Sequence, residues 1–439
     1  MTAAGAHDAA AAGAATDAAR DAARARAESV ARESYGGLLA LLAAPGGDIP
    51  SAEDALADAF LEALTRWPAA GIPGNPEGWL LTVARNRLRD RWKSTAVRRT
   101  VPLDPTVLFG LSGSLDPPAP LSLDDVDPDE IPDKRLELLF VCAHPAIDPG
   151  IRTPLMLQTV LGFDAARIAV AFSLPESTMA QRLVRAKRRI RDARIPFTVP
   201  GLSELSGRLS AVLEAIYGAY AIDWQGVAGP SVRESLAAES LYLATVLAAL
   251  LPREPEVLGL AALLSFSLSR APARAAPDGS TIALDDQDPA RWDRELIRQG
   301  EMLLRRAHGF DRIGRFQVEA AIESVHCDRA RSGETDRPAL LALYGALVRI
   351  APTLGARVAL AATVGAVEGP AAGLAALDSV AVLPGADRFQ PVWATRAHLL
   401  AQAGRVRDAR VAYQRAIALC ADAGIRSRLQ EQCALLGTA

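Results

Sequence analysis

The sequence predicts an all-α protein: two small helical domains joined by an acidic linker and followed by an α-solenoid-like C-terminal domain. Half of the 439 residues are apolar and only 5% are aromatic, which suits helices built from Ala and Leu. Apolar residues recur at three- and four-residue steps along most of the chain. A chain of this length exceeds the usual size of one hydrophobic core, so two or three domains are expected.

Residues 1–29 are an Ala-rich leader, predicted to be disordered apart from a helical tendency near residues 20–31. The leader has no uninterrupted apolar segment, so it does not have the pattern of a secretory signal. No run in the chain reaches membrane-spanning length without a charge. The four cysteines are far apart and form no CxxC pair, which predicts no disulfide framework and favours a reducing cytoplasm.

The first predicted domain, residues 30–99, contains two helices separated by a loop. Residues 53–67 (EDALADAFLEALTRW) form an amphipathic helix, with Ser51 and Asp54 as a capping box variant at its start. Its predicted apolar side carries Leu56, Phe60, Leu61 and Leu64. The loop at residues 71–76 has two Pro and two Gly and cannot be regular helix. The apolar stripe of the next helix, WLLTVARNRLRDRWK, comprises Trp79, Leu80, Val83, Leu88 and Trp92.

This second helix is strongly basic. Residues 79–99 hold seven Arg or Lys and one Asp, a local charge of about +6. A basic helix that carries aromatic side chains and follows a flexible loop can bind a phosphate backbone and stack on exposed bases. The alternative is that Trp79 and Trp92 are only core aromatics. Residues 100–133 then form a predicted acidic flexible linker, with eight acidic residues and no basic one, too polar to fold alone.

The second predicted domain, residues 134–199, contains the most informative stretch, FDAARIAVAFSLPESTMAQRLVRAKRRIRDAR (163–194). It indicates two short helices joined by a tight turn, because Pro175 fixes its own φ and disfavours helix at Leu174. Glu176 and Ser177 open the second helix, where a carboxylate suits the positive end of the helix dipole. A helix-turn-helix needs this layout, with the second helix entering the major groove.

The second helix of this motif has two predicted faces. Met179, Leu183, Ala186 and Ile190 recur at helical spacing and should face the core. The other face carries hydroxyls, an amide and guanidiniums suited to base edges and phosphates. Its members are Ser177, Thr178, Gln181, Arg182, Arg185, Arg188 and Arg189. Residues 176–194 have a net charge of about +5, which leaves about −14 on the rest of the chain. The alternative is a solvated helix with a charged face.

Together these segments resemble the extracytoplasmic-function sigma factors, the small bacterial initiation factors of RNA polymerase. Residues 52–68 are similar to the helix that docks on the polymerase clamp, and residues 75–93 (NPEGWLLTVARNRLRDRWK) to the segment that melts and reads the −10 element. Residues 136–191 are similar to the domain that reads the −35 element. The likeness extends, through segments such as residues 284–300, to a subgroup with a long helical C-terminal extension.

The resemblance implies a set of contacts. Promoter DNA at the −10 element would contact Asn75, Trp79, Arg85, Asn86, Arg87, Asp90 and Arg91. At the −35 element it would contact Ser177, Thr178, Gln181, Arg182, Arg185 and Arg188. The RNA polymerase core, through its beta-prime clamp helices, would contact Asp54, Asp58, Phe60 and Leu61. The acidic linker would thread through polymerase channels, as a phosphate mimic or as a plain spacer. An anti-sigma or other regulatory protein is a further expected partner, through the extension.

Residues 200–439 are predicted to be helix after helix. The expected helices span residues 203–221, 232–250, 254–270, 290–307, 313–331, 336–350, 354–367, 370–379, 389–402 and 405–418. The last pair has tetratricopeptide spacing, carried by Trp393, Ala397, Leu400, Gly404, Ala409, Tyr413 and Ala416. Gly373 and Ala376 belong to an earlier, degraded unit. An α-solenoid-like domain follows, whose concave surface either binds a partner or merely packs its own helices.

No motif indicates an enzyme, a cofactor or a metal site. GxSxG, HExxH and P-loop patterns are absent from the sequence. Cys142 and His144 lie two residues apart but have no further ligands at zinc spacing. The acidic segment at residues 285–293 lacks the Gly and distal Glu of an EF-hand, and Asp288 before Pro289 is explained as a helix cap. Two other functions remain open: a DNA-binding regulator that acts without polymerase, and a solenoid interaction adaptor.

Overall fold

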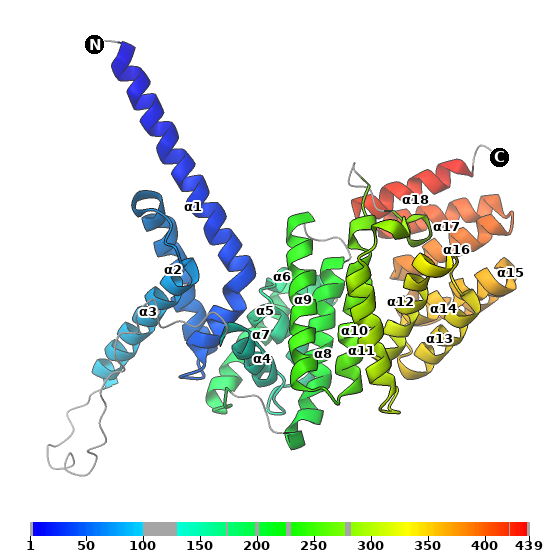
Figure 1. The fold of residues 1–439 in the computed structure, drawn as a ribbon, viewed down its shortest axis with the longest axis horizontal. Coiled ribbons are helices and arrows are strands. Elements are labelled where there is room, and N and C mark those ends of the chain that lie inside the picture. Colours follow the sequence, from blue (N-terminus) through cyan, green and yellow to red (C-terminus); the bar gives the residue numbers. More distant parts are fainter. Residues whose placement is uncertain are drawn as a thin grey trace. The chain divides into compact units, whose positions relative to one another are not determined.

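The computed structural model describes residues 3–99, 130–172, 174–197, 202–224, 230–276, 282–420 and 422–436. These residues form helices and no strand, so the predicted all-α fold is confirmed (Figure 1). None of the described helices is long and apolar enough to cross a lipid bilayer. The chain divides into two compact units, Met1–Ala219 and Tyr220–Ala439.

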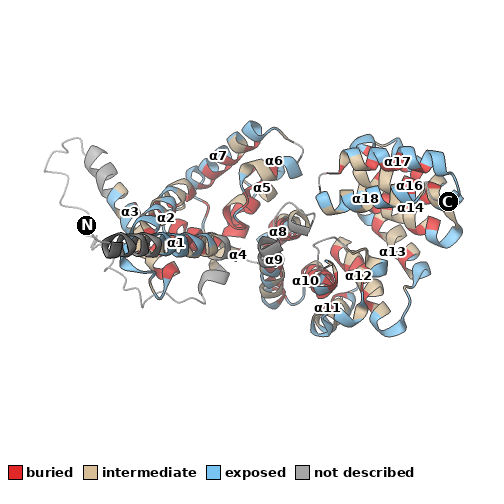
Figure 2. Ribbon diagram, turned by 90° about the horizontal axis from the view of Figure 1, so that it is seen from above, coloured by how far each residue is buried: buried red, intermediate tan, exposed pale blue. Residues whose placement is uncertain are grey.

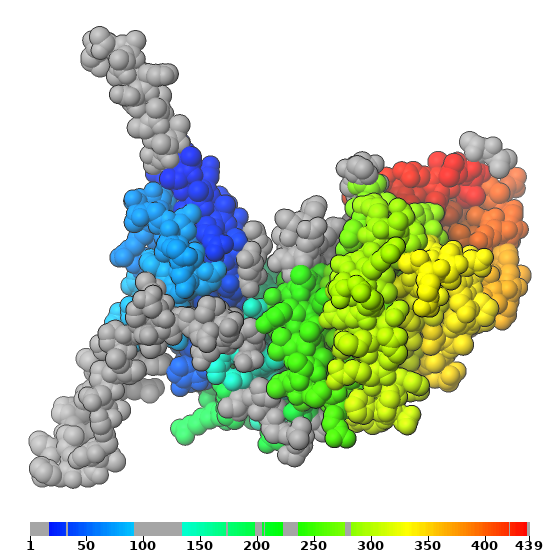
Figure 3. Space-filling view, viewed as in Figure 1, coloured from blue at the N-terminus to red at the C-terminus, as the bar shows by residue number. Residues whose placement is uncertain are grey.

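Three helices open the first unit and pack against one another: α1 (Ala3–Ala43), α2 (Ile49–Ala70) and α3 (Pro76–Arg99). Figure 3 shows α1 and α2 side by side. The structure differs here from the predicted disordered leader, because α1 begins at Ala3. Ala is the strongest helix former, and Ala23 and Ala27 are buried within the unit.

The buried side of α2 coincides only in part with the predicted apolar side. Its buried side chains are mostly small: Ile49, Ala52, Ala55, Leu56, Ala59, Ala63 and Trp67. Of the predicted apolar side, Leu56 is buried, whereas Leu61 is 64% exposed and Leu64 is 43% exposed. The helix also begins earlier than expected, at Ile49, where the Asp48 carboxylate accepts the Ser51 backbone N–H at 3.3 Å and its hydroxyl at 2.7 Å. Because alanines line the seam, α1 and α3 can approach α2 closely.

Beyond α3, the described residues of the first unit form four helices and the first part of a fifth. They are α4 (Glu130–Cys142), α5 (Pro149–Thr159), α6 (Ala165–Ala171), α7 (Glu176–Asp192) and α8 (Leu202–Trp224). The α6–α7 pair is the predicted helix-turn-helix, with the expected core side chains of α7 buried. Most of the predicted linker lies outside the described residues, and its last four residues belong to α4. The first unit ends at Ala219, within α8, whose first part buries Leu209 and Val212, and the domain boundary at residue 200 stays a prediction.

The second unit begins around a central helix. α10 (Pro255–Ser269) is buried along nearly its whole length and packs against α9 (Pro230–Leu250), α11 (Arg294–His308) and α12 (Arg315–Ser332), as Figure 2 shows. Gly300 lies against the ring of Phe266, 2.9 Å from where a Cβ would stand. Short 3₁₀ turns, Ala271–Ala273, Leu284–Asp286 and Pro289–Arg291, connect α10 to α11.

The remaining helices stack in sequence, each packing on the next, as in a solenoid. They are α13 (Arg337–Ile350), α14 (Leu354–Glu368), α15 (Pro370–Ala381), α16 (Gln390–Gln402), α17 (Val406–Leu419) and α18 (Ala423–Leu435), with a 3₁₀ turn at Ala386–Arg388. Ala397, Leu400, Ala409, Tyr413 and Ala416 form one buried cluster with Trp393 packed against it, as the tetratricopeptide spacing predicts. α18 was not among the predicted helices.

Candidate nucleic-acid interface

The predicted −35 face of α7 lies open on the first unit. Ser177, Thr178 and Gln181 are exposed in the first turns of the helix, and Arg185 and Arg188 are exposed one and two turns later. Arg182 is half-buried. Among the described residues, Arg182, Arg185 and Arg188 form no ion pair with a carboxylate. This face therefore offers hydroxyl, amide and guanidinium groups to a ligand without first breaking ion pairs.

A hollow of about 420 Å³ lies between α7 and the start of α5. It is lined by Arg182, Arg185 and Arg189 on one side and by the segment from Ala146 to Ile151 on the other. Arg189 Nε donates to the Ala146 carbonyl at 3.4 Å, which ties the helix to this segment. Three guanidiniums around one hollow suit a phosphate oxygen or a base edge.

Asn75, predicted to contact DNA at the −10 element, also has a structural role. Its Oδ1 accepts the Gly78 backbone N–H at 2.8 Å, and its carbonyl accepts the Trp79 N–H at 3.1 Å. Asn75 thus caps α3, with Pro76 at the first helical position, as helix starts favour. The side chain is exposed, so its amide group remains accessible beside the cap.

Trp79 is partly a packing residue and partly accessible, so it fits both the core and the base-stacking interpretation. Its ring meets Trp67 of α2 edge to face, with centroids 5.6 Å apart and planes at 64°. It is half-buried, whereas Leu80, Leu81, Ala84 and Leu88 form the buried side of α3. Trp79 therefore supports the α2–α3 packing and leaves part of its ring open. The side chain of Trp92 lies outside the described residues.

Two arginines of α3 are paired with carboxylates of α2. Arg87 pairs with Glu62 at 2.9 Å, and Arg91 bridges Asp54 at 3.0 Å and Asp58 at 2.9 Å. Asn86 and Asp90 are exposed, and Arg85 is half-buried. The structure thus brings predicted DNA contacts of α3 together with predicted polymerase contacts of α2. Glu62 was missed by sequence reasoning.

Leu61 and Leu64 lie on the outer surface of α2, with Phe60 half-buried beside them. Exposed apolar side chains next to the acidic Asp54 and Asp58 form a surface suited to a protein partner with basic and apolar groups. The geometry is compatible with the clamp contact implied by the family resemblance.

The Cys142–His144 pair does not have the properties of a metal site. Burial raises the pKa of the Cys142 thiol to about 12, and the thiol lies 3.4 Å from the Thr159 hydroxyl. His144 accepts the Ala146 backbone N–H through Nδ1 at 3.1 Å, and burial, with the nearby Arg208, lowers its pKa. Within the described residues, no group of three His, Cys, Asp or Glu side chains is arranged as a metal ligand set.

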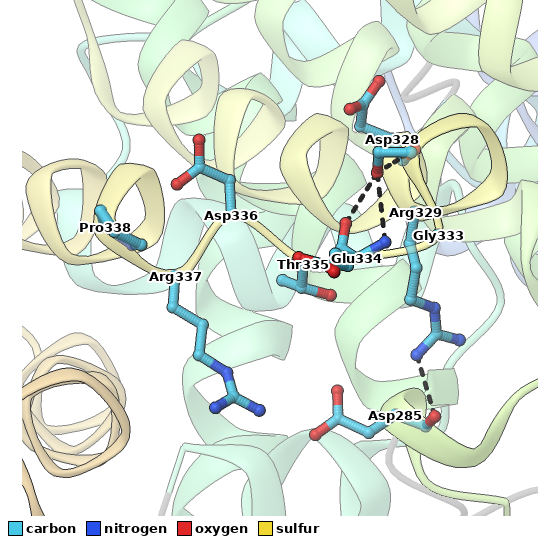
Figure 4. Close-up of a pocket in the computed structure, with 10 residues that line it drawn as sticks. Asp285, Asp328, Arg329, Gly333, Glu334, Thr335, Asp336, Arg337 and Pro338 are labelled. Atoms are coloured by element: carbon cyan, nitrogen blue, oxygen red, sulfur yellow. Dashed lines mark hydrogen bonds between the residues drawn. The ribbon is translucent and has the colours of Figure 1, made fainter.

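The acidic segment at residues 285–293 is a structural joint of the second unit. Arg329 donates to the Asp285 carbonyl at 2.9 Å and to the Gln287 carbonyl at 2.6 Å, and its guanidinium lies 5.1 Å from the Trp292 ring centroid. Asp288 caps the turn at Pro289 and Asp293 caps α11. Beside Arg329 is an open polar hollow of about 840 Å³ whose far side includes Asp336 and Arg337 (Figure 4).

Comparisons with known proteins cover both units. Residues 32–98, from within α1 to α3, match the family sigma-70 region 2. Residues 208–308 match a family of unknown function, DUF6596. Uncharacterized protein R00370 of Rhizobium meliloti (strain 1021) is 34% identical over 383 residues, which are 87% of this chain and 89% of that protein.

A shorter match is to the Probable ECF RNA polymerase sigma factor SigI of Mycobacterium tuberculosis (strain H37Rv). It is 31% identical over 156 residues, which are 35% of this chain and 50% of that protein. No solved structure matches the chain significantly.

Proposed function

Because the chain belongs to the extracytoplasmic-function RNA polymerase sigma factors, in a subgroup with a long helical C-terminal extension, we propose that it directs the polymerase core to specific promoters and starts transcription there. The observation that carries the proposal is the pair of basic helices in one unit, α3 within the sigma-70 region 2 match and α7 in a helix-turn-helix. The proposed role is non-enzymatic and cytoplasmic.

In this proposal each helix has its own target. α7 reads the −35 element through Ser177, Thr178, Gln181, Arg182, Arg185 and Arg188. α3 and its preceding loop hold the melted −10 element through Asn75, Trp79, Arg85, Asn86, Arg87, Asp90 and Arg91. α2 docks on the beta-prime clamp helices through Asp54, Asp58, Phe60 and Leu61.

Run-off transcription with core polymerase tests the proposal, and α2 distinguishes it from a regulator that acts alone. Leu61→Asp places a charge in the proposed clamp contact and should abolish both core binding and transcripts. Val411→Asp, on α17, is the matched control, because Val411 is also 64% exposed. A regulator that needs no polymerase would keep its DNA binding and show no core binding in either variant or in the wild type.

For the extension, we propose a scaffolding role that holds the factor in its working arrangement, with binding of a regulatory protein as a second use. The solenoid-like stacking of α13–α18 supports a packing or partner-binding surface. A chain ending at Ala219, the limit of the first unit, should then lose transcription. If the extension instead inhibits, the shortened chain should gain both transcription and DNA binding. Transcription equal to that of the full chain would contradict both roles.

A further inference from the structure

The recognition helix α7 has a third face, on which two basic side chains contact the start of α2. Lys187 lies on this face, with its side chain only 9% exposed. Its Nζ is 2.5 Å from Oε1 of Glu53 in α2. One turn later, Arg191 lies 3.8 Å from Asp48, the residue that caps α2. Two basic residues of the proposed −35 helix therefore contact the domain proposed to read the −10 element.

The choice of lysine at this position is unusual for this chain. Only three of its 48 basic residues are lysines: Lys93, Lys134 and Lys187. A lysine ammonium is a compact charge on a flexible stem, whereas a guanidinium presents five donors that all need partners when buried. A narrow site with a single carboxylate therefore suits lysine. Lys187 fits a domain contact better than a place on the DNA face, where arginines predominate.

A backbone contact lies beside this ion pair. Gly36 of α1 sits against the end of α5, where a Cβ on it would be 1.9 Å from the Val160 carbonyl oxygen. A side chain at position 36 would push the two domains apart. Tyr35 is next to the same seam, and burial, together with the Glu53 charge, raises its pKa. The two domains are thus held together by a close backbone contact and by a largely buried ion pair.

We propose that the Lys187–Glu53 pair is a latch that holds the two DNA-reading domains closed in the free protein, and that binding both promoter elements requires the latch to open. Arg91 of α3 and Lys187 of α7 pair with neighbouring residues of α2, Asp54 and Glu53. Because packed helix axes are 8–10 Å apart, the axes of α3 and α7 are within about 20 Å of each other at this level of α2. Elements centred at −10 and −35 are about 25 base pairs apart, or about 85 Å of duplex at 3.4 Å per step. The closed form cannot span that distance. That the two domains must separate rests on the proposed function. The packing of α7 on α2 in the free protein does not depend on that function.

Carbodiimide cross-linking of the full chain tests the closed form directly, because this zero-length reagent joins an amine to a carboxylate only where they touch. We expect an amide between Lys187 and Glu53 in the free protein, identified by peptide mass spectrometry, and at least about a tenfold lower yield once core polymerase and promoter DNA are bound. Lys187→Arg keeps the charge, lacks the amine and should give no such link. No link in the free protein would overturn the closed form, and an undiminished link in a transcribing complex would overturn the need for opening.

A charge reversal tests the latch energetically. Glu53→Lys puts two ammonium groups together and should therefore favour the open form. Apparent affinity scales with the open fraction, so affinity should rise by about fivefold for promoter DNA that carries both elements and a pre-melted −10 region. Affinity for a fragment with only the −35 element should not change. Glu28→Lys makes the same charge change on an exposed turn of α1 and is the control. Equal gains from both variants would overturn the latch. Failure of the proposed function would appear separately, as an absence of transcripts. The cross-link in the free protein would still show whether the two domains are packed together.

Discussion

α3 and α7 are both basic helices of the first unit, but their arginines are held differently. On α3, Arg87 and Arg91 are engaged by three carboxylates of α2. On α7, Arg185 and Arg188 face solvent and form no ion pair among the described residues. An exposed ion pair must be broken before its arginine can bind phosphate, whereas an unpaired arginine needs no such step. In the proposed function, α7 would therefore bind DNA without losing an ion pair, whereas α3 would first release Arg87 and Arg91 from the carboxylates of α2.

The largest expected effect concerns base recognition by α7. A good bidentate base contact is worth about 1–3 kcal/mol, so Gln181→Ala should change the preferred −35 sequences, with losses of about five- to 150-fold on the best site. Arg188→Ala, two turns on, should weaken all sequences alike as a phosphate contact. A promoter library bound by each variant measures both. The same uniform loss in both variants would contradict the division of roles on α7.

A second, intermediate effect separates the cap of α3 from base capture. Asn75→Ala removes the acceptor for the Gly78 N–H and should cost about 1 kcal/mol of stability in thermal unfolding. It should also reduce open-complex formation while leaving polymerase binding intact. Asn75→Ser restores the cap but not the amide, so stability should recover and melting should not. Permanganate footprints of Asn75→Ala that match the wild type would show that Asn75 is only a cap.

A comparison of the predicted and observed helices shows which features the sequence could predict. The bounds of α6, α7 and the paired helices α16 and α17 follow from apolar spacing, turns and prolines, which are local signals. The core side chains of α7 followed from the same spacing. α18 was missed because only Leu429 of that helix is buried, which gives almost no periodic signal.

Other features depend on neighbours that local patterns do not encode. Leu61 has the spacing of a core residue, yet the alanines of α2 occupy the seam instead. Lys187 meets a partner 134 residues away, so no short motif identifies it. The rarity of lysine in this chain was the one available signal. Asp48 was overlooked as the α2 cap because Ser51 matched the capping pattern nearly as well.

The smallest expected effect sharpens the comparison of the two helices most directly. Glu62 has no place in the proposed DNA or clamp contacts, and Glu62→Gln removes the carboxylate that pairs with Arg87. The change should cost less than about 1 kcal/mol of stability, because the Arg87 side chain is 50% exposed and its ion pair is screened by water. The released Arg87 should raise affinity for single-stranded −10 DNA by about two- to fivefold, and the slope of log affinity against log salt should steepen by about 0.7. Glu176→Gln makes the same change in the first turn of α7, where the carboxylate forms no ion pair among the described residues, and should leave that affinity unchanged. Fluorescence anisotropy over a salt series measures both variants. Equal gains would mean that the α2 carboxylates do not restrain α3, and the difference between the two helices would then lie only in their positions.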